Sequence, residues 1–159
     1  MTADAPGDRI EELARRIARL EDVEAIKRLQ ADYAAACDDH YNPDRLAALF
    51  TEDGVWDGGQ FGRVSGSEAL HSHFAKSSAQ FTWALHFMIT PSIEVSSDGE
   101  TARGSWYLWE PAKIAEDGGE QAYWAATVYD IHYAKTKQGW KFREMSLDVR
   151  LFAPYDKGW

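Results

Sequence analysis

The sequence predicts an α+β domain in which N-terminal helices pack on one face of a long-stranded, meandering sheet. Apolar residues in the first part of the chain recur at spacings of three and four, which is the period of a helix buried on one side. From about Thr82 onward the period becomes two, which is typical of strands, and Gly-containing turns separate the strand segments. Strands this long must twist and curl, so helices that cap them would enclose a pocket.

The N-terminal region predicts a tail followed by a helix. Residues 1–7 end in a Pro-Gly pair and are expected to form a flexible tail before a single domain over residues 8–159. A helix is then predicted until Asn42-Pro43 stops it. A break near Glu21-Asp22 would divide this region into an N-terminal arm and a main helix. The apolar stripe consists of Ile10, Leu13, Ile17, Leu20, Val23, Ile26, Leu29 and Tyr33.

Two further helices and a first strand are predicted before the long strands. A short helix is expected after Pro43, and its apolar residues are Leu46, Leu49 and Phe50. The segment Gly54–Phe61 is rich in Trp, Val and Gly and is predicted to form a strand. The sequence Ser-Gly-Ser-Glu at residues 65–68 then leads into another helix.

Four long strands are predicted in the second half of the chain, and a turn suited to a hairpin separates each strand from the next. Their expected ranges are Thr82–Val95, Thr101–Ile114, Gln121–Thr136 and Trp140–Leu151. Alternation in the second of these strands places Trp106, Leu108 and Glu110 on one face. It places Tyr107 and Trp109 on the other face, where they would pack beneath helices or a partner subunit.

Composition narrows the class of partner. The formal net charge is −9, from 26 acidic and 17 basic residues, so nucleic acid and anionic membranes are not expected as partners. Cys37 is the single cysteine, which leaves no internal disulfide and favours a reducing cytoplasm. The N-terminus carries no apolar signal segment, and no run of 18 apolar residues occurs. Seven Trp, seven Tyr and seven Phe favour a large core or a lined cavity.

The residues that could do chemistry are limited to acid–base groups. The chain has no Gly-rich phosphate loop, no nucleophile elbow, no zinc-protease motif and no paired-cysteine motif. His86 stands inside the apolar run ALHFMIT, where burying a ring without a partner costs about 1–3 kcal/mol. His86 is therefore either a core residue whose ring is hydrogen-bonded to a neighbour or a residue with a functional role. Asp38 lies near the expected end of the helix, where its carboxylate is repelled by the negative end of the helix dipole. A neighbouring cation such as an imidazolium would offset this repulsion. Tyr33 lies about 140° from Asp38 on an ideal helix, so the two could meet one cavity only where the helix frays.

The order of these elements resembles the SnoaL-like branch of the nuclear transport factor 2-like superfamily, over nearly the whole chain from about residue 8. The segments that carry the resemblance are ADYAAACDDHYNPDRLAALFTEDGVWDGG, WALHFMITPSIEV and GWKFREMSLDVRLFAPY. The resemblance implies a cone, in which a curved, mixed and largely antiparallel sheet wraps around a deep pocket and N-terminal helices cap it. It also implies a homo-oligomer, a dimer or a trimer. The same fold supports isomerases, dehydratases, epoxide hydrolases, polyketide cyclases and noncatalytic binders, so the fold alone does not name the chemistry.

The resemblance also implies roles for particular residues. Asp38 paired with His86 is similar to the Asp–His dyad of hexachlorocyclohexane dehydrochlorinases, and scytalone dehydratases use a related pair. In such a dyad His86 would remove a proton while Asp38 fixes its tautomer. Tyr33 resembles a tyrosine of bile acid dehydratases, which would donate to the leaving oxygen or polarise a carbonyl. Glu110 and Arg150 fall near an acidic residue and an arginine that line the pocket of those enzymes.

These implications combine into one expected function with two alternatives. We expect a cofactor-independent lyase, a dehydratase of a hydrophobic hydroxylated ring compound such as a steroid or polyketide, with no metal or organic cofactor. The residues expected to bind substrate are Glu110, Arg150, Trp56, Trp106 and Phe50. An isomerase or polyketide cyclase would use the same base without loss of water. A noncatalytic small-molecule binding protein would use Asp38 and His86 only to satisfy a polar core.

Overall fold

The computed structural model describes residues 6–158, in which helices pack on one face of a mixed sheet. The helices are α1 (Pro6–Asp38), α2 (Pro43–Ala48) and α3 (Ser67–Gln80), with a 3-10 turn at Gly59–Phe61. The strands are β1 (Phe50–Asp57), β2 (Arg63–Ser65), β3 (Phe81–Ala84), β4 (Phe87–Val95), β5 (Thr101–Glu116), β6 (Gly119–Thr136) and β7 (Gly139–Pro154). Of the expected tail, residues 1–5 lie outside the described part, and residues 6 and 7 already belong to α1.

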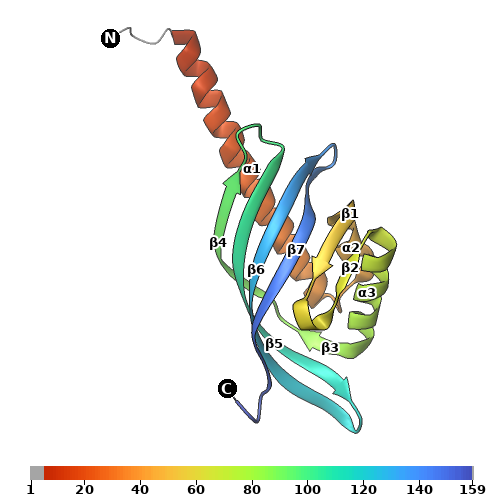
Figure 1. Ribbon diagram of the computed structural model, residues 1–159. Helices are drawn as coiled ribbons and strands as arrows, with labels where there is room; N and C mark the ends of the chain where they lie inside the picture. The colour runs from red at the N-terminus through yellow and green to blue at the C-terminus, as the bar shows by residue number, and fades with distance from the viewer. Residues whose placement is uncertain (1–5, 159) are drawn as a thin grey trace.

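The sheet confirms the α+β class and the curved, mixed sheet expected from the sequence. Its strand order is β2-β1-β7-β6-β5-β3, and β4 also pairs with β5. Strands β4 to β7 pair antiparallel with their neighbours, whereas β1 runs parallel to β7. Figure 1 shows α1 crossing behind the long strands, with α2 and α3 beside β1 and β2. No helix among the described residues is long and apolar enough to cross a membrane.

Several element boundaries differ from the sequence prediction, and two of these differences bear on the site and the core. The expected strand Thr82–Val95 is two strands, because Leu85 and His86 interrupt it while both halves remain paired with β5. Phe50 begins β1 instead of ending the short helix, since its backbone pairs with β7 opposite Phe142. The interruption at His86 matters for function, because it turns a residue expected within a strand into a residue of a short connection.

Alternation places the core on the inner, helix-facing side of the sheet. Trp106, Leu108 and Glu110 are buried there, as the period of two predicts. Tyr107 is 52% exposed on the other face, so the expectation that helices cover this face is wrong. Phe87, opposite Trp109 of β5, is exposed as well, and so is Leu85 in the connection before it. The reason is the same for all three residues: every described helix lies on the inner face.

Helix α1 is continuous and does not break at Glu21-Asp22. Neither Gly nor Pro occurs near this point, and the buried Asp22 carboxylate accepts hydrogen bonds from the sheet. One donor is Trp140 Nε1, at 2.8 Å, and the other is Lys135 Nζ, at 2.6 Å. Asp22 therefore fixes the helix to the ends of β6 and β7 at the point where its N-terminal turns leave the sheet (Figure 1).

Replacing Asp22 by alanine is expected to destabilise the fold. The change leaves the buried Trp140 Nε1–H without its acceptor, which costs about 1–3 kcal/mol of unfolding free energy. Denaturant unfolding followed by Trp fluorescence measures the loss. Asp32→Ala, on an exposed position of the same helix, is the matched control and should change stability by less than about 0.5 kcal/mol. Equal stability of the two variants would contradict the anchoring role.

Candidate active site

A cavity of about 390 Å³ opens on the inner side of the sheet, where α1 ends and α3 passes the strands. Aromatic and aliphatic side chains make up most of its wall, and the polar groups gather at one end. The aromatic lining residues are Tyr33, Tyr41, Trp56, Phe61, Phe74, Phe81, Tyr129 and Phe152. An apolar cavity with a few convergent polar groups is the usual form of a small-molecule site.

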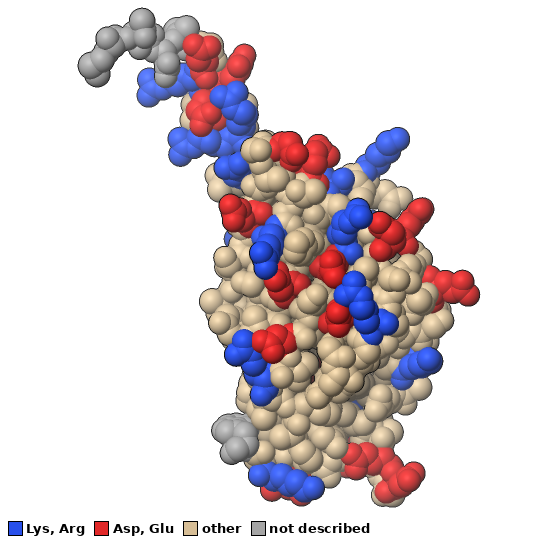
Figure 2. Space-filling view, viewed as in Figure 1, with Lys and Arg blue, Asp and Glu red and all other residues tan. Residues whose placement is uncertain are grey.

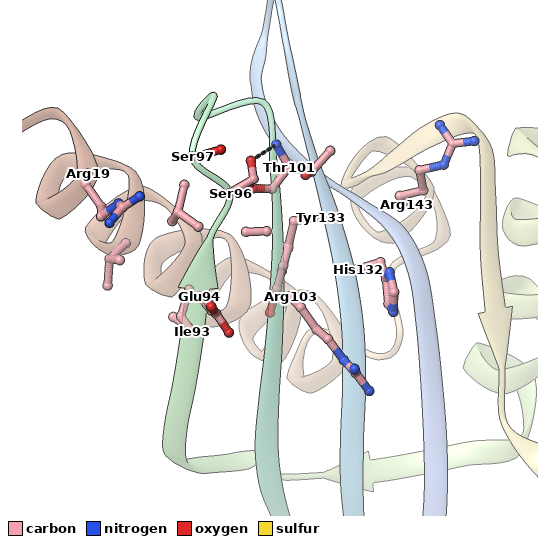
Figure 3. Close-up of a pocket in the computed structure, with 13 residues that line it drawn as sticks. Arg19, Ile93, Glu94, Ser96, Ser97, Thr101, Arg103, His132, Tyr133 and Arg143 are labelled. Carbon is pink, nitrogen blue, oxygen red and sulfur yellow. Dashed lines mark hydrogen bonds between the residues drawn. The ribbon is translucent and has the colours of Figure 1, made fainter. Parts of the chain in front are cut away.

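A second hollow, of about 730 Å³, lies between α1 and the far ends of β4 to β7. Figure 3 shows that its charged side chains do not converge: Arg19 comes from α1, while Arg103, His132 and Arg143 extend from separate strands. Arg103 is already paired with Asp130, and the other strand arginine with Asp53. Although this hollow is larger, it lacks the enclosed apolar wall and the acid–base cluster of the first cavity.

Asp38 and His86 meet at the wall of the smaller cavity. Asp38 is the last residue of α1, and His86 lies in the connection between β3 and β4. The Asp38 Oδ1 atom accepts from the backbone N–H of His86 at 2.9 Å and lies 2.9 Å from its ring Nδ1. The His86 side chain is 3% exposed and the Asp38 side chain 30%. One carboxylate oxygen thus orients both the backbone and the ring of the histidine.

The other ring nitrogen of His86 faces a tyrosine and a second carboxylate. Its Nε2 atom lies 3.2 Å from the Tyr41 hydroxyl and 3.6 Å from Glu110 Oε1. Tyr41 donates its hydroxyl hydrogen to Glu110 at 2.9 Å. When Tyr41 does so, its oxygen can accept from Nε2 only if that nitrogen carries a proton. Asp38, His86, Tyr41 and Glu110 therefore form one chain of hydrogen-bonding groups.

Opposing effects set the charge of His86. Burial alone lowers its pKa, because it disfavours the imidazolium. Cys37, the Glu110 carboxylate and the hydrogen bond with Asp38 act in the other direction and together raise the pKa of His86 well above its ordinary value. Burial and the adjacent Glu110 raise the pKa of Tyr41 well above 10, so its phenol keeps its proton. The two neighbouring carboxyl groups thus favour the protonated imidazole, against the effect of burial.

Tyr33 and Trp56 line the cavity as the sequence predicts. Tyr33 is 3% exposed and packs edge-on against Tyr129, with ring centroids 6.4 Å apart. Its burial raises its pKa well above 10, which keeps its hydroxyl a donor. Trp56 lies against His73 of α3, with ring centroids 4.3 Å apart. Burial lowers the pKa of His73, so this second histidine of the cavity is neutral near pH 7.

Three residues expected to bind substrate lie elsewhere. Phe50 packs in the core against Phe74 and Phe142, and Trp106 donates its indole N–H to Tyr133 at 3.0 Å. Arg150 is largely exposed and pairs with Asp148 on its own strand.

Alternation along β7 explains the position of Arg150. The register shifts between Ala126 and Thr127, whose partners are Leu151 and Val149. Arg150 has no partner in this ladder. Leu147 and Val149 both line the cavity, so the period of two turns Arg150 to the other face. The β-bulge acts only after Arg150, by bringing Phe152 instead of Leu151 into the lining.

Sequence reasoning missed Tyr41 and gave no role to His73. Tyr41 is three residues beyond the end of α1, in a turn where both His40 (φ 53°) and Tyr41 (φ 49°) have left-handed backbone. Non-glycine residues rarely adopt this conformation, and such strain is concentrated at functional sites. No sequence motif marks the turn. His73 is three residues after Leu70 and directly before Phe74, and this helical spacing places it beside the inner face. That spacing is the sequence signal that could have assigned His73 to the cavity.

Comparisons with known proteins agree with this architecture. A hexachlorocyclohexane dehydrochlorinase, LinA type 2, is 21% identical with a TM-score of 0.79, over 87% of this chain and 92% of that one. The dehydrochlorinase LinA type 3 from Novosphingobium barchaimii LL02 is 21% identical with a TM-score of 0.77, over 87% and 93%. A protein from Novosphingobium aromaticivorans, provisionally named a scytalone dehydratase, is 21% identical with a TM-score of 0.76, over 88% and 91%.

The sequence comparisons decide the family. No curated protein matches the sequence. The family model of the SnoaL-like domain matches residues 18–146, which include α1 from residue 18 to its end and nearly all of the sheet. The resemblance inferred from the sequence is thereby confirmed, and the chain belongs to the SnoaL-like domain family of the nuclear transport factor 2-like superfamily.

Proposed function

We propose that this protein is a cofactor-independent lyase, a dehydratase of a hydrophobic hydroxylated ring compound, in which His86 transfers the proton. One observation carries the proposal. The buried His86 ring is oriented by Asp38 at Nδ1 and presents Nε2 to an apolar cavity beside Tyr41 and Glu110. A base that is fixed by a carboxylate and aimed into a cavity has the geometry of general acid–base catalysis.

The hydrogen-bonded chain supplies both a base and an acid. A shift of two protons, from Nε2 to Tyr41 and from Tyr41 to Glu110, leaves His86 neutral and Glu110 protonated. His86 then takes the proton from the substrate carbon as the carbon–oxygen bond breaks. Tyr41 returns a proton, resupplied by Glu110, to the leaving hydroxide. One water is released, and the cluster ends in the state from which it began.

The remaining cavity groups fit a flat ring substrate. Tyr33 keeps its proton and can donate a hydrogen bond to a substrate carbonyl, which would acidify the neighbouring C–H bond. Trp56, Tyr129 and Phe152 supply aromatic walls for a ring. The names of the similar structures support elimination chemistry, since dehydrochlorination and dehydration are both β-eliminations. An isomerase or cyclase would use the same base and would release no water.

We also propose that the protein acts as a homo-oligomer. Large apolar side chains stand on the outer face of the sheet, where Phe87 of β4 is 51% exposed and Ile89 49%. Tyr107 lies opposite Ile89 on β5, and Trp109 next to it stacks on Trp124 with ring centroids 5.1 Å apart. Contiguous apolar surface of this kind is typical of interfaces between subunits.

Removing the base should abolish turnover. His86→Ala and Asp38→Asn are each expected to lower kcat about 10²- to 10⁴-fold, because general-base catalysis contributes that much. The substrates to test are β-hydroxy ketones of steroid or polycyclic aromatic size, and mass spectrometry of the product measures the loss of one water. His71→Ala, at an exposed histidine of α3, is the control and should retain full activity. Turnover by both site variants within a fewfold of wild type would refute the mechanism, and a product of unchanged mass would favour the isomerase.

Tyr41 tests the proton chain separately from substrate binding. Tyr41→Phe keeps the ring, which packs on Phe81, but removes the hydroxyl that joins His86 to Glu110. We expect kcat to fall at least about tenfold while KM changes little, because the lost group acts on proton transfer. Tyr155→Phe, at a 63% exposed tyrosine, is the control. A variant that only raises KM would instead place Tyr41 in substrate binding.

The charge state of His86 can be measured without a substrate. We expect its ring to titrate well above pH 6.5 by NMR, and Glu110→Gln to bring the midpoint down because it removes a carboxylate beside Nε2. Since the folded pKa is raised, the stability that the charged His86 contributes is fully present below about pH 6.5 and is lost as the pH rises through the folded pKa. The stability difference between wild type and His86→Gln should therefore shrink as the pH rises. A midpoint below 6.5 would show that burial dominates.

A further inference from the structure

The first turns of α1 carry an apolar stripe that nothing in the described chain covers. Residues 7–21, called the arm here, are all exposed and extend beyond the sheet (Figure 1). Four large side chains follow the arm, and they are Ile10 at 68% exposed, Leu13 at 50%, Ile17 at 56% and Leu20 at 66%. Isolated exposed apolar residues are ordinary, but four in a row along one helix indicate a contact surface.

The arm's own domain cannot cover this stripe, because the stripe turns around the helix before it reaches the sheet. From Leu20 the apolar residues advance by three to Val23, by three to Ile26 and by three again to Leu29. Each such step falls about 60° short of a full helical turn, so three steps rotate the stripe by about 180°. Ile26 and Leu29 are buried in the core. The stripe of the arm therefore points away from the sheet that the rest of α1 packs against.

The residue types along the stripe match the seam of a two-stranded coiled coil. The spacings from Ile10 to Leu20 are three, four and three, which places both isoleucines at position a of a heptad and both leucines at position d. Isoleucine at a with leucine at d favours parallel dimers over higher assemblies. Two isolated peptides would need a longer seam to form stable helices and pair. The arm needs less, because it continues a helix that the fold already holds.

The charges beside the seam favour a second copy in parallel orientation. In this heptad frame Arg16 is at position g and Glu21 at position e. In a parallel, in-register pair, a residue at position g of one helix lies beside the residue at position e in the next heptad of the partner helix. Arg16 of each chain would therefore lie beside Glu21 of the other, which gives two such pairs. An antiparallel pair would instead bring Arg9 and Arg16 together. Arg15 is on the outside and pairs within its own helix with Glu12 at 2.8 Å, and Figure 2 shows charges of both signs around the arm.

We propose that the arm is a dimerisation element, in which two copies of this chain pair in parallel through Ile10, Leu13, Ile17 and Leu20. The proposal does not depend on the chemistry assigned to His86. It also names a surface different from the outer sheet face around Phe87 and Tyr107. Because the seam has two heptads, we expect an equilibrium that shifts with protein concentration.

Sedimentation equilibrium of the full chain over a wide concentration range tests the pairing. Ile17→Asp places a charge in the seam and should halve the mass of the wild-type particle at the same concentration. Ala18→Asp adds the same charge to an exposed position off the seam and should leave the mass unchanged. The arm contributes nothing to the core, so neither substitution should destabilise the fold. When each variant is compared with wild type in the same oligomeric state, the two unfolding midpoints should therefore be equal. A monomeric wild type, or equal masses for wild type and Ile17→Asp, would overturn the proposal.

Cysteine cross-linking tests the orientation. In a parallel dimer each seam residue faces its own counterpart, so Leu20→Cys alone should give a disulfide-linked dimer under mild oxidation, and so should Ile10→Cys alone. The native Cys37 is buried and supplies no competing thiol, so the unmodified chain is the blank. Cross-linking only in a mixture of the two variants would mean an antiparallel pair and would overturn the proposal.

A charge reversal tests the pair formed by Arg16 and Glu21. Arg16→Glu alone should weaken the dimer, and the double variant Arg16→Glu with Glu21→Arg should restore it.

Discussion

The contact between Asp38 and His86 is the interaction on which the rest of the site depends. A helix that ends in a carboxylate and a strand that is interrupted by a histidine are each unfavourable alone. Together they satisfy each other, because one carboxylate oxygen accepts from both the backbone and the ring of His86. The same contact joins the end of α1 to the connection between β3 and β4. It thereby fixes the direction in which Nε2 of His86 faces the cavity.

The inner end of the cavity concentrates charge in apolar surroundings. Glu110 is buried and reaches His86 and Tyr41, and electrostatic interactions are stronger in such surroundings than in water. That environment explains why the pKa of the buried His86 rises when burial alone would lower it. It also gives a reason for the strained turn at His40 and Tyr41, because the turn is what brings the Tyr41 hydroxyl between the two groups.

Helix α1 serves two purposes along its length. From Val23 onward it packs on the sheet and ends at the site, whereas the arm presents its apolar residues away from the fold. Asp22 lies at the boundary and holds the helix to Lys135 and Trp140. The proposed dimer contact and Asp38 thus lie toward opposite ends of one continuous helix.

The sequence by itself determined the class of fold and the pair at the centre of the site. Helical and strand periods are local properties, so the change of period predicted helices followed by a curled sheet. The settings of Asp38 and His86 marked each residue as unusual, and the resemblance to dehydrochlorinases implied that they form a pair. Tertiary structure alone decided which neighbours join them. The face of β7 that meets the cavity carries Val149 and leaves Arg150 outside, core packing removed Phe50 and Trp106 from the cavity, and a left-handed turn added Tyr41. Each of these depends on register or on backbone angles set by distant contacts, and such contacts leave no periodic trace in the chain.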